Sequence, residues 1–440
     1  MILSPPGDTF VAAGNTRRPF LLVDWTGESV SQKPKGDSAM STSIFRSHGA
    51  LRAALAAVAG LLLAAGCGGG GDNMPASQSA SQGRAFTEGT ITGFGSIIVN
   101  GIRFDESSAQ VIDDDDQAHD RNDLKLGMTV QVVSSGIDRG SNSAKASRVR
   151  FGAEIVGPVS AISAATTPKT LTVLDQIVEI SATTVFDDLP NGFNSIKVND
   201  VLEIHALLDT TTGRYLAKRI EPKPGATVFK LRGIVADLNA GAKTFKIGAA
   251  LIDFSGIAAA DLPLNFANGL KVRVRLNTVK NGSGAWVATA IRAEQREMED
   301  RDEAEVEGII TAFTSTTSFS VNGLPVDASK AAFPDGTAGV VLGARVEVEG
   351  AIVNGVLLAT KVELEDDRNE DRNELNGTIS ALNTQAKTFV VRGVTVHYGA
   401  TTRFDDGSEA NLANGRQVEV KGTLSADGMR VEASRIEFKS

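Results

Sequence analysis

Short runs of alternating hydrophobic and polar residues cover most of the chain after residue 85. The run GARVEVEG at residues 343–350 is typical, because Val346 and Val348 alternate with charged residues. This period of two places both valines on one face of an extended strand and predicts that this face lies in a core. Relatives of the run begin at Gly127 (GMTVQV), Gly269 (GLKVRV) and Gly415 (GRQVEV).

Four short sequence patterns recur along the chain. They occur five times, each time in the same order. The first, G-x-x-V-x-V, is anchored at Gly127, Asn199, Gly269, Gly343 and Gly415, with spacings of 72, 70, 74 and 72. The second, G-x-[IV]-x-x-[FIL], begins at Gly89, Gly157, Gly233, Gly308 and Gly377. The third is an apolar pair two residues apart: Ile97 and Val99, Leu171 and Val173, Phe245 and Ile247, Phe319 and Val321, Phe389 and Val391. The fourth, A-x-x-[IV], begins at Ala146, Ala217, Ala288, Ala359 and Ala433. Four independent markers in one order establish a fivefold repeat.

Each repeat predicts the same set of strands. In the fourth repeat the strand-like runs are EGIITAF, SFSVNG and LPVDAS, then, after an irregular stretch, ARVEVEG and GVLLATKVEL. Five antiparallel strands with an insertion between the third and fourth predict an OB-like barrel, with an SH3-like barrel or a small sandwich as alternatives. Asn199 replaces the anchoring glycine of its repeat, and because asparagine tolerates positive φ we expect a left-handed turn there.

The predicted fold class is therefore all-β, with five tandem small antiparallel barrels of roughly 70 residues each. Barrels in a row are expected to be stabilised by their own cores and by contacts with the next barrel in sequence. The predicted repeats occupy residues 86–152, 153–226, 227–298, 299–368 and 369–440.

A leader precedes the repeats. Residues 40–66 have a basic start, an apolar run of 13 residues and a small-residue end (LAAG) before Cys67. This is the layout of a secretory signal peptide, and the apolar run is short for a transmembrane helix. The leader resembles a bacterial lipoprotein signal, in which the cysteine is lipidated and becomes the mature N-terminus. The alternative is a plain signal peptide followed by a cysteine without this role.

The segments on either side of the leader carry no fold signal. Residues 1–39 are interpreted as an over-extended gene start. Residues 67–85 are rich in Gly, Ser and Gln and predict a flexible tether. Gly68 follows the cysteine where an Asp would favour retention in the inner membrane. By resemblance to such lipoproteins, an outer-membrane lipoprotein of the cell envelope is expected.

The organisation as a whole resembles predicted bacterial lipoproteins that carry tandem copies of a domain of unknown function. The resemblance covers residues 86–440 and rests on the LAAGC leader and the five repeats. It implies an envelope location and a barrel architecture, and it implies no substrate.

The amino-acid composition narrows the classes of partner that the chain is expected to bind. From Cys67 onward the chain has 38 Lys and Arg against 49 Asp and Glu, a net charge of −11, which disfavours nucleic acid as a partner. With one cysteine no intrachain disulfide is possible. OB-like barrels bind single strands or oligosaccharides with stacking aromatics. From Cys67 onward, the tryptophan and tyrosine residues that could stack on such a ligand are Trp286, Tyr215 and Tyr398. Glycan binding stays open.

Acidic motifs are the main candidates for chemistry. FDD occurs at Phe186 and Phe404, FPDG at Phe333, AADLP at Ala259 and VIDDDD at Val111. Such acids bind Ca²⁺, act as acid and base, or cap turns, and the turn role is favoured because the motif recurs between repeats. Asp113 to Asp116 with Asp120 form the densest cluster and the strongest metal candidate. The charged runs 296–305 and 365–374 are interpreted as solvated linkers or strand ends, with weak binding of divalent cations as the alternative.

No catalytic motif is present. His119, His205 and His397 are the histidines after the leader, and His205 and His397 are expected to face outward from strands. The chain has no G-x-S-x-G elbow, no H-E-x-x-H and no phosphate-binding glycine loop. No catalytic, metal-binding or cofactor-binding residue is assigned.

Charged residues on the outer face vary together between repeats. The fourth and fifth strands carry Glu203 with Arg219, Glu347 with Lys361, Glu419 with Arg435, Gln131 with Arg148, and Arg273 with Ala290. We predict that each pair consists of direct cross-strand neighbours.

These observations predict a non-enzymatic envelope protein, anchored to a membrane by lipid on Cys67, whose barrels act as a spacer or an interaction array. The alternative is a ligand-binding module for a glycan or a divalent cation. The expected partners are the membrane and an unidentified glycan or envelope protein. No cofactor and no nucleic acid are expected.

Overall fold

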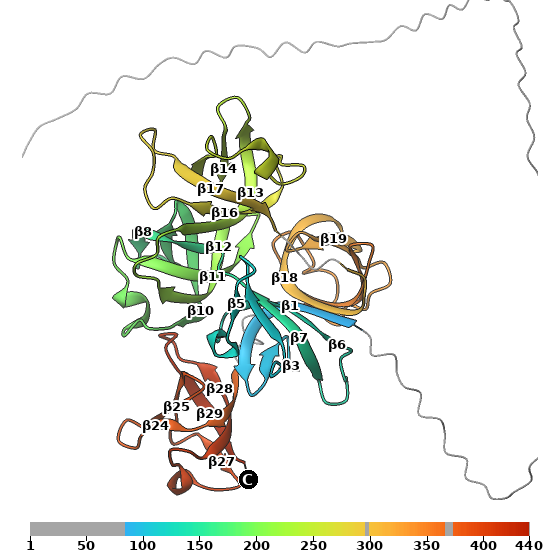
Figure 1. Cartoon of the computed structure of the whole chain (residues 1–440). Helices are drawn as coiled ribbons and strands as arrows, with labels where there is room; N and C mark the ends of the chain where they lie inside the picture. Colours follow the sequence, from blue (N-terminus) through green and yellow to red (C-terminus); the bar gives the residue numbers. More distant parts are fainter. Residues whose placement is uncertain (1–83, 295–298, 366–372, 440) are drawn as a thin grey trace, which may run out of the picture. The chain divides into compact units, whose positions relative to one another are not determined.

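The computed structural model describes residues 84–294, 299–365 and 373–439 (Figure 1). The predicted upstream segment 1–39, the leader 40–66, Cys67 and the tether up to residue 83 lie outside the described residues. Among the described residues, no helix has the length and the apolar character needed to cross a membrane.

The described chain folds into strands, turns and four short 3₁₀ helices, and the fold class is the predicted one. The first barrel contains β1 (Arg84–Phe94), β2 (Ile97–Val99), β3 (Ile102–Asp105), β4 (Gln110–Asp113), β5 (Ala118–His119), η1 (Arg121–Asp123), β6 (Thr129–Ser135) and β7 (Ser143–Phe151). The second contains β8 (Ile155–Ser163), β9 (Lys169–Val173), β10 (Gln176–Phe186), η2 (Gly192–Ser195), β11 (Val201–Asp209) and β12 (Arg214–Pro222). The third contains β13 (Phe229–Asn239), β14 (Thr244–Ile247), β15 (Ala250–Asp253), η3 (Ala259–Asp261), β16 (Lys271–Leu276) and β17 (Trp286–Ala293).

The last two barrels repeat this order. The fourth contains β18 (Arg301–Ser315), β19 (Ser318–Val321), β20 (Leu324–Asp327), β21 (Arg345–Val353) and β22 (Val356–Leu364). The fifth contains β23 (Asn373–Thr378), β24 (Ser380–Asn383), β25 (Thr388–Val391), β26 (Val394–His397), β27 (Arg403–Asp405), η4 (Glu409–Asn411), β28 (Gln417–Leu424) and β29 (Val431–Phe438). In the fourth barrel, turns replace the 3₁₀ helix between the third and fourth main strands.

Each barrel closes in the strand order 1-2-3-5-4-1. In the fourth barrel, β18 pairs with β19 and β21, β19 with β20, and β21 with β22, all antiparallel, while β20 pairs with β22 in parallel. A closed ring of five strands cannot alternate direction throughout, so one pair must be parallel. The ring leaves no free edge, which is the advantage of an OB-like barrel over an open sheet.

The fourth main strand is built as the alternation predicts. Val346 and Val348 are fully buried in the core of the fourth barrel. The anchoring residue has positive φ in every repeat, including the predicted left-handed turn at Asn199 (φ 75°). The anchoring glycines are Gly127 (82°), Gly269 (90°), Gly343 (84°) and Gly415 (87°).

The recurring alanine of the last strand lies beside a β-bulge. In the fourth barrel Glu349 pairs with Lys361 and the next residue, Gly350, pairs with Ala359, so Thr360 is the extra residue. The bulge shifts the alternation, and Ala359 points into the core. The Thr360 hydroxyl donates a hydrogen bond to the Glu349 carbonyl (3.1 Å). A serine or threonine makes the equivalent bond at Ser147, Thr289 and Ser434.

The predicted cross-strand pairs are wrong by two residues. Glu347 lies directly opposite Glu363, and Lys361 lies opposite Glu349. The two-residue turn at Asn354 and Gly355, both with positive φ, joins β21 to β22, and the bulge then adds one residue to β22. The same offset separates the other predicted pairs: Glu203 from Arg219, Glu419 from Arg435, Gln131 from Arg148, and Arg273 from Ala290.

Barrels that are not consecutive in sequence contact one another, contrary to the expectation that only neighbours do. The N-terminal half of β1 pairs in parallel with β18, and Phe86 of β1 lies in the core of the fourth barrel. The C-terminal end of β1 pairs in parallel with β23 of the fifth barrel. β8 and β13 also pair. The long first strands therefore join the barrels through backbone hydrogen bonds.

Candidate functional site

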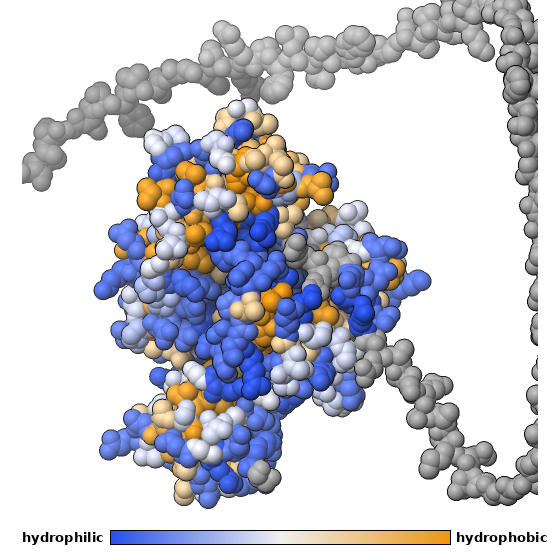
Figure 2. Space-filling view, viewed as in Figure 1, coloured by the Kyte–Doolittle hydropathy of each residue, from blue (hydrophilic) through white to orange (hydrophobic). Residues whose placement is uncertain are grey.

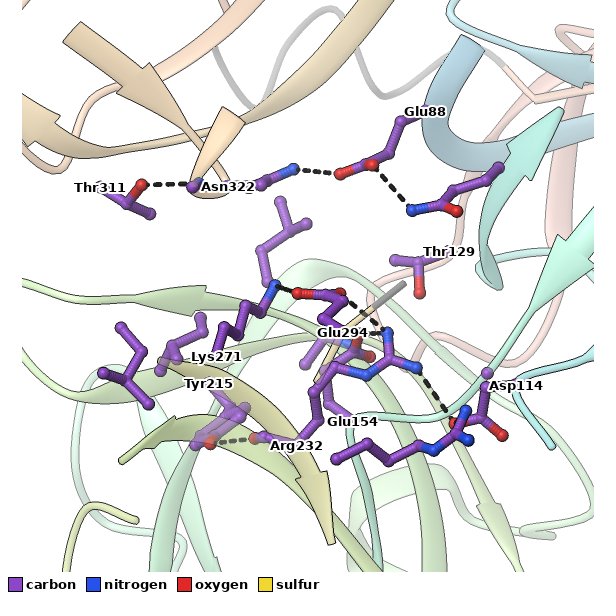
Figure 3. Close-up of a pocket in the computed structure, with 18 of the residues that line it drawn as sticks. Glu88, Asp114, Thr129, Glu154, Tyr215, Arg232, Lys271, Glu294, Thr311 and Asn322 are labelled. Atoms are coloured by element: carbon purple, nitrogen blue, oxygen red, sulfur yellow. Dashed lines mark hydrogen bonds and ion pairs between the residues drawn. The ribbon is translucent and has the colours of Figure 1, made fainter. Parts of the chain in front are cut away.

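A cavity of about 280 Å³, with many charged residues in its lining, is formed by the first four barrels (Figure 3). The third barrel supplies Lys271 and Arg273 of β16 and Arg292 of β17, and the second supplies Glu154 and Tyr215. The charged residues that line the cavity are Glu88, Asp114, Arg150, Glu154, Arg232, Lys271, Arg273, Arg292, Glu294 and Glu307. Its volume lies near the lower end of the ~300–1,000 Å³ of small-molecule sites.

The outer face of the third barrel is basic. Across three adjacent strands, Arg232 lies directly opposite Arg273, and Arg273 lies directly opposite Arg292. In the next row, Lys230 lies opposite Arg275. Like charges in direct cross-strand pairs are destabilising, so this face requires anions.

Asp114, from the turn after β4, supplies one of those anions. Its Oδ2 atom lies 3.1 Å from Nη2 of Arg232 and 3.3 Å from Nη1 of Arg273. Its Oδ1 atom accepts a hydrogen bond from Lys230 (3.1 Å). Asp115 adds pairs with Lys230 (2.8 Å), Arg273 (3.4 Å) and Arg275 (3.8 Å). Asp114 is 5% exposed, so its own ion pairs are largely buried.

Burial perturbs the groups around Arg232. It raises the pKa of Glu154, against the opposing charges of Arg232 and His205. Glu154 also accepts a hydrogen bond from the backbone N–H of Ala206 (2.8 Å) and lies 3.4 Å from Arg232. Burial likewise raises the pKa of Tyr215, whose hydroxyl donates to the Arg232 carbonyl (2.6 Å). Burial lowers the pKa of Arg273, with Arg232 and Arg292 acting in the same direction and Asp114 against it.

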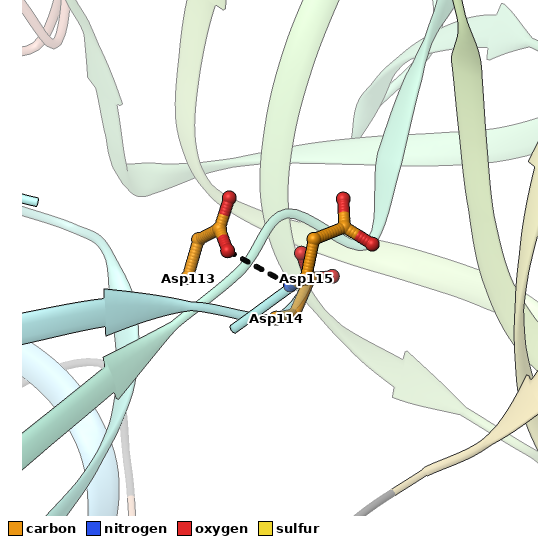
Figure 4. A group of neighbouring side chains, drawn as sticks. All are labelled: Asp113, Asp114 and Asp115. Atoms are coloured by element: carbon orange, nitrogen blue, oxygen red, sulfur yellow. Dashed lines mark hydrogen bonds between the residues drawn. The ribbon is translucent and has the colours of Figure 1, made fainter. Parts of the chain in front are cut away.

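The predicted metal candidate is thus largely engaged by cations of the protein itself. Carboxylate oxygens of Asp113, Asp114 and Asp115 lie within 4.8 Å of one another (Figure 4). Asp113 accepts hydrogen bonds from the backbone of Asp115 and Gln117, both at 2.8 Å, while its two neighbours bind the basic face. Asp116 pairs with Arg150 (2.8 Å), and Asp120 caps η1. The acidic run therefore docks the first barrel onto the third.

A second carboxylate cluster, which the sequence did not single out, lies on the outer face of the fourth barrel. Oxygens of Glu305, Glu347 and Glu349 lie within 4.8 Å of one another. Arg139 of the β6–β7 turn lies 3.3 Å from Glu305 and 3.6 Å from Glu349. Burial raises the pKa of Glu305 to about 7. Burial, followed by the charges of Glu305 and Glu365, raises the pKa of Glu347 to about 9.

Glu347 differs from the equivalent glutamates of the second and fifth barrels in the charge of one nearby residue. Glu203 pairs with Lys223 (2.6 Å), and Glu419 pairs with Lys439 (3.0 Å). Lys223 and Lys439 each follow the last strand of their barrel, and the equivalent residue of the fourth barrel is Glu365. Although burial opposes the shift, His205 and Lys223 lower the pKa of Glu203 to about 2.

The FDD aspartates are structural, as predicted, but they do not act as turn caps alone. Asp187 of the second barrel pairs with Arg219, and Asp405 of the fifth pairs with Arg435. Both arginines lie on the last strand of their barrels. Asp335 of the FPDG motif accepts a hydrogen bond from the backbone N–H of Leu364 (3.0 Å). Asp261 of AADLP lies in η3.

His119, His205 and His397 belong to three different barrels. His205 lies on β11 between the core residues Ile204 and Ala206, so it faces outward from its barrel as expected, and other residues bury it fully. His119 contacts Asp123 (3.2 Å) and Asp113 (3.4 Å), and His397 contacts Glu432.

The two charged runs begin strands where the structure describes them. Arg301 to Glu305 open β18, and Arg301 and Glu305 are 3% and 2% exposed, so this part is not a solvated linker. Asn373 and Glu374 begin β23. Residues 295–298 and 366–372 lie outside the described residues.

Sequence reasoning did not identify the basic face of the third barrel as a site. The available signal was the change from Glu to Arg273 at a position that is acidic in three other repeats. The lining residues come from four repeats, and no pattern within one repeat reveals that they meet.

The comparison with protein families agrees with the repeat structure. Residues 156–221, 307–363 and 376–437, in the second, fourth and fifth repeats, match the profile of a domain of unknown function, DUF5666. No curated protein matches the chain. Four solved chains match, among them Drosophila Unr CSD456, which is 13% identical, with 49% of this chain and 98% of that chain covered and a TM-score of 0.12.

Proposed function

We propose that this protein is a lipid-anchored component of a bacterial cell envelope whose five barrels form a structural interaction array. Cys67 carries the lipid, residues 68–83 form the tether up to the start of β1 at Arg84, and the barrels stand off an outer membrane. The array works without catalysis.

The docking of the acidic run onto the basic face of the third barrel is the observation that supports a structural role. Asp114 is buried and held by three cations from another repeat. Together with the pairing of β1 with β18 and β23, this holds non-consecutive barrels together. Charged outer faces that differ between copies of one barrel suit recognition of different surfaces.

The surface is consistent with an array in an aqueous compartment. On the face shown in Figure 2, hydrophilic residues predominate and apolar residues form scattered patches. Large apolar side chains that are strongly exposed, such as Leu264 (91%) and Val279 (72%), belong to loops of the third barrel.

Replacing Cys67 with Ser tests the anchor. The variant is expressed with its leader in a bacterial host, and membranes are separated from soluble periplasmic protein. We expect the parent chain in the outer-membrane fraction, labelled by radioactive palmitate, and Cys67→Ser in the soluble fraction without label. Unchanged membrane partitioning together with absence of label in the parent chain contradicts lipidation.

Ligand binding is the second candidate function, and the cavity with its charged lining residues favours it. The cavity is large enough for a small molecule and carries a basic wall. Divalent-cation binding by Asp113 to Asp116 is less favoured, because a cation there would have to displace Lys230 and Arg273 from Asp115.

A further inference from the structure

The three arginines in the row on the third barrel differ in their acidic partners. Arg232 pairs with Asp114, Glu154 and Glu294. Arg273 pairs with Asp114 and Asp115. On the other side of Arg273, Arg292 lies directly opposite it across β16 and β17. Within the described part of the chain, no carboxylate forms an ion pair with Arg292. One anion position, at Arg292, is therefore left by the described residues.

This position opens into the cavity. Arg273 and Arg292 both line it, and Arg273 is the more buried of the two, with 12% of its side chain exposed. A guanidinium group presents parallel N–H donors that bind a carboxylate or a phosphate.

The opposite wall presents hydrogen-bond acceptors. The Oε1 atom of Gln131 is buried and has no hydrogen-bond partner among the described residues. Its Nε2 atom donates to Glu88 (3.0 Å), which also accepts from Asn322 (2.9 Å). All three residues line the cavity, and Figure 3 shows Glu88 and Asn322 across from Lys271 and Arg232. A buried acceptor without a donor is costly, and a ligand hydroxyl would satisfy it.

We propose that the cavity binds a small hydroxylated carboxylate of the hexuronate class, with its carboxylate at Arg292 and its hydroxyls at Gln131 and Glu88. The proposal deepens the second candidate function, ligand binding, and is independent of the lipid anchor. A hexuronate matches both walls of the cavity. Its carboxylate is an anion for the basic wall, and its hydroxyl groups are donors for the acceptor wall. The cavity volume of about 280 Å³ accommodates one sugar ring with a few waters.

Calorimetric titration of the full chain in detergent tests this assignment. The probes are D-glucuronate, D-glucose and inorganic phosphate. We expect saturable heat with glucuronate, and binding at least tenfold weaker for glucose, which lacks the carboxylate, and for phosphate, which does not reach the acceptor wall. Absence of heat with glucuronate, or tighter binding of phosphate, overturns the proposal.

Two variants locate the site. Arg292→Gln removes the guanidinium that has no acidic partner, and because the residue is exposed the fold is retained, as circular dichroism checks. We expect at least tenfold weaker glucuronate binding. The control Arg121→Gln makes the same charge change on the exposed η1 turn and leaves binding unchanged. Glucuronate binding that survives Arg292→Gln overturns the placement. Membrane fractionation of Cys67→Ser reads out the anchor separately, so failure of one proposal is distinguishable from failure of the other.

Discussion

Oδ2 of Asp114 lies 3.1 Å from Nη2 of Arg232, although the two residues are 118 positions apart and belong to different barrels. Both side chains are largely buried, with 5% and 15% exposed. A buried ion pair contributes little net stability, but removing one partner leaves the other charge uncompensated. Docking of the first barrel onto the third therefore requires that this contact forms.

We expect Asp114→Asn to lower the free energy of unfolding by about 3–5 kcal/mol, because Arg232, Arg273 and Lys230 lose their shared carboxylate. Thermal and urea denaturation followed by circular dichroism measure this change. The control is Asp116→Asn in the same acidic run. Asp116 pairs with Arg150 but is 50% exposed, so a loss of about 0–1 kcal/mol is expected. Equal effects of the two substitutions would argue against ionic docking.

The raised pKa of Glu347, about 9, predicts a pH dependence of stability. Between pH 4.5 and about 9 the folded state holds a proton on this carboxyl that the unfolded state has released. Stability from this group therefore falls as pH rises through that window. Glu365→Lys supplies the cation found beside Glu203 and Glu419 and should lower this pKa. We expect the variant to be more stable than the parent at pH 8, by about 1 kcal/mol or more, and the difference to shrink towards pH 4.

The mirror-image substitution is the matched control. Lys223→Glu in the second barrel removes the cation from Glu203 and should lower the melting temperature at pH 8 more than at pH 4. Melting curves at half-unit pH steps compare the two variants. A pH-independent effect of Glu365→Lys is incompatible with protonation of Glu347 as the cause.

The aromatic cluster of the third barrel predicts a large effect of truncation. Phe245 is fully buried, and its ring centroid lies 5.8 Å from that of Phe254 and 5.4 Å from that of Phe266. We expect Phe245→Ala to cost about 3–5 kcal/mol of unfolding free energy, through lost transfer energy and a cavity. Leu264→Ala, at a residue that is 91% exposed in the same barrel, should change it by less than about 0.5 kcal/mol. Differential scanning calorimetry separates these outcomes.

Most of the fold follows from local pattern, and little of the site does. Period-two alternation identifies Val346 and Val348 as core, and the recurrence of glycine or Asn199 identifies the left-handed turn, because both depend on one strand at a time. The register that places Glu347 opposite Glu363 depends on a two-residue turn and a β-bulge. The joint variation of charged residues between repeats reveals neither of these features. The cavity depends on contacts between repeats, and these are long-range properties. The change at Arg273 was visible in the sequence, but its partner Asp114 lies in another repeat.

The alanine beside the β-bulge supports a final prediction. In all five barrels an alanine of the last strand directly precedes the extra residue of the bulge and points into the core. Ala359 is 4% exposed and pairs with Gly350, where a Cβ atom would lie 2.1 Å from the carbonyl oxygen of Leu358. Two small residues at this point let β21 and β22 approach closely. We expect Ala359→Leu to overpack the core and to lower the unfolding free energy by about 1–3 kcal/mol. Leu358→Ala, at the adjacent residue that is 41% exposed, is the control and should cost less than about 1 kcal/mol. Urea denaturation measures both, and a neutral Ala359→Leu would show that the bulge leaves more room than the geometry indicates.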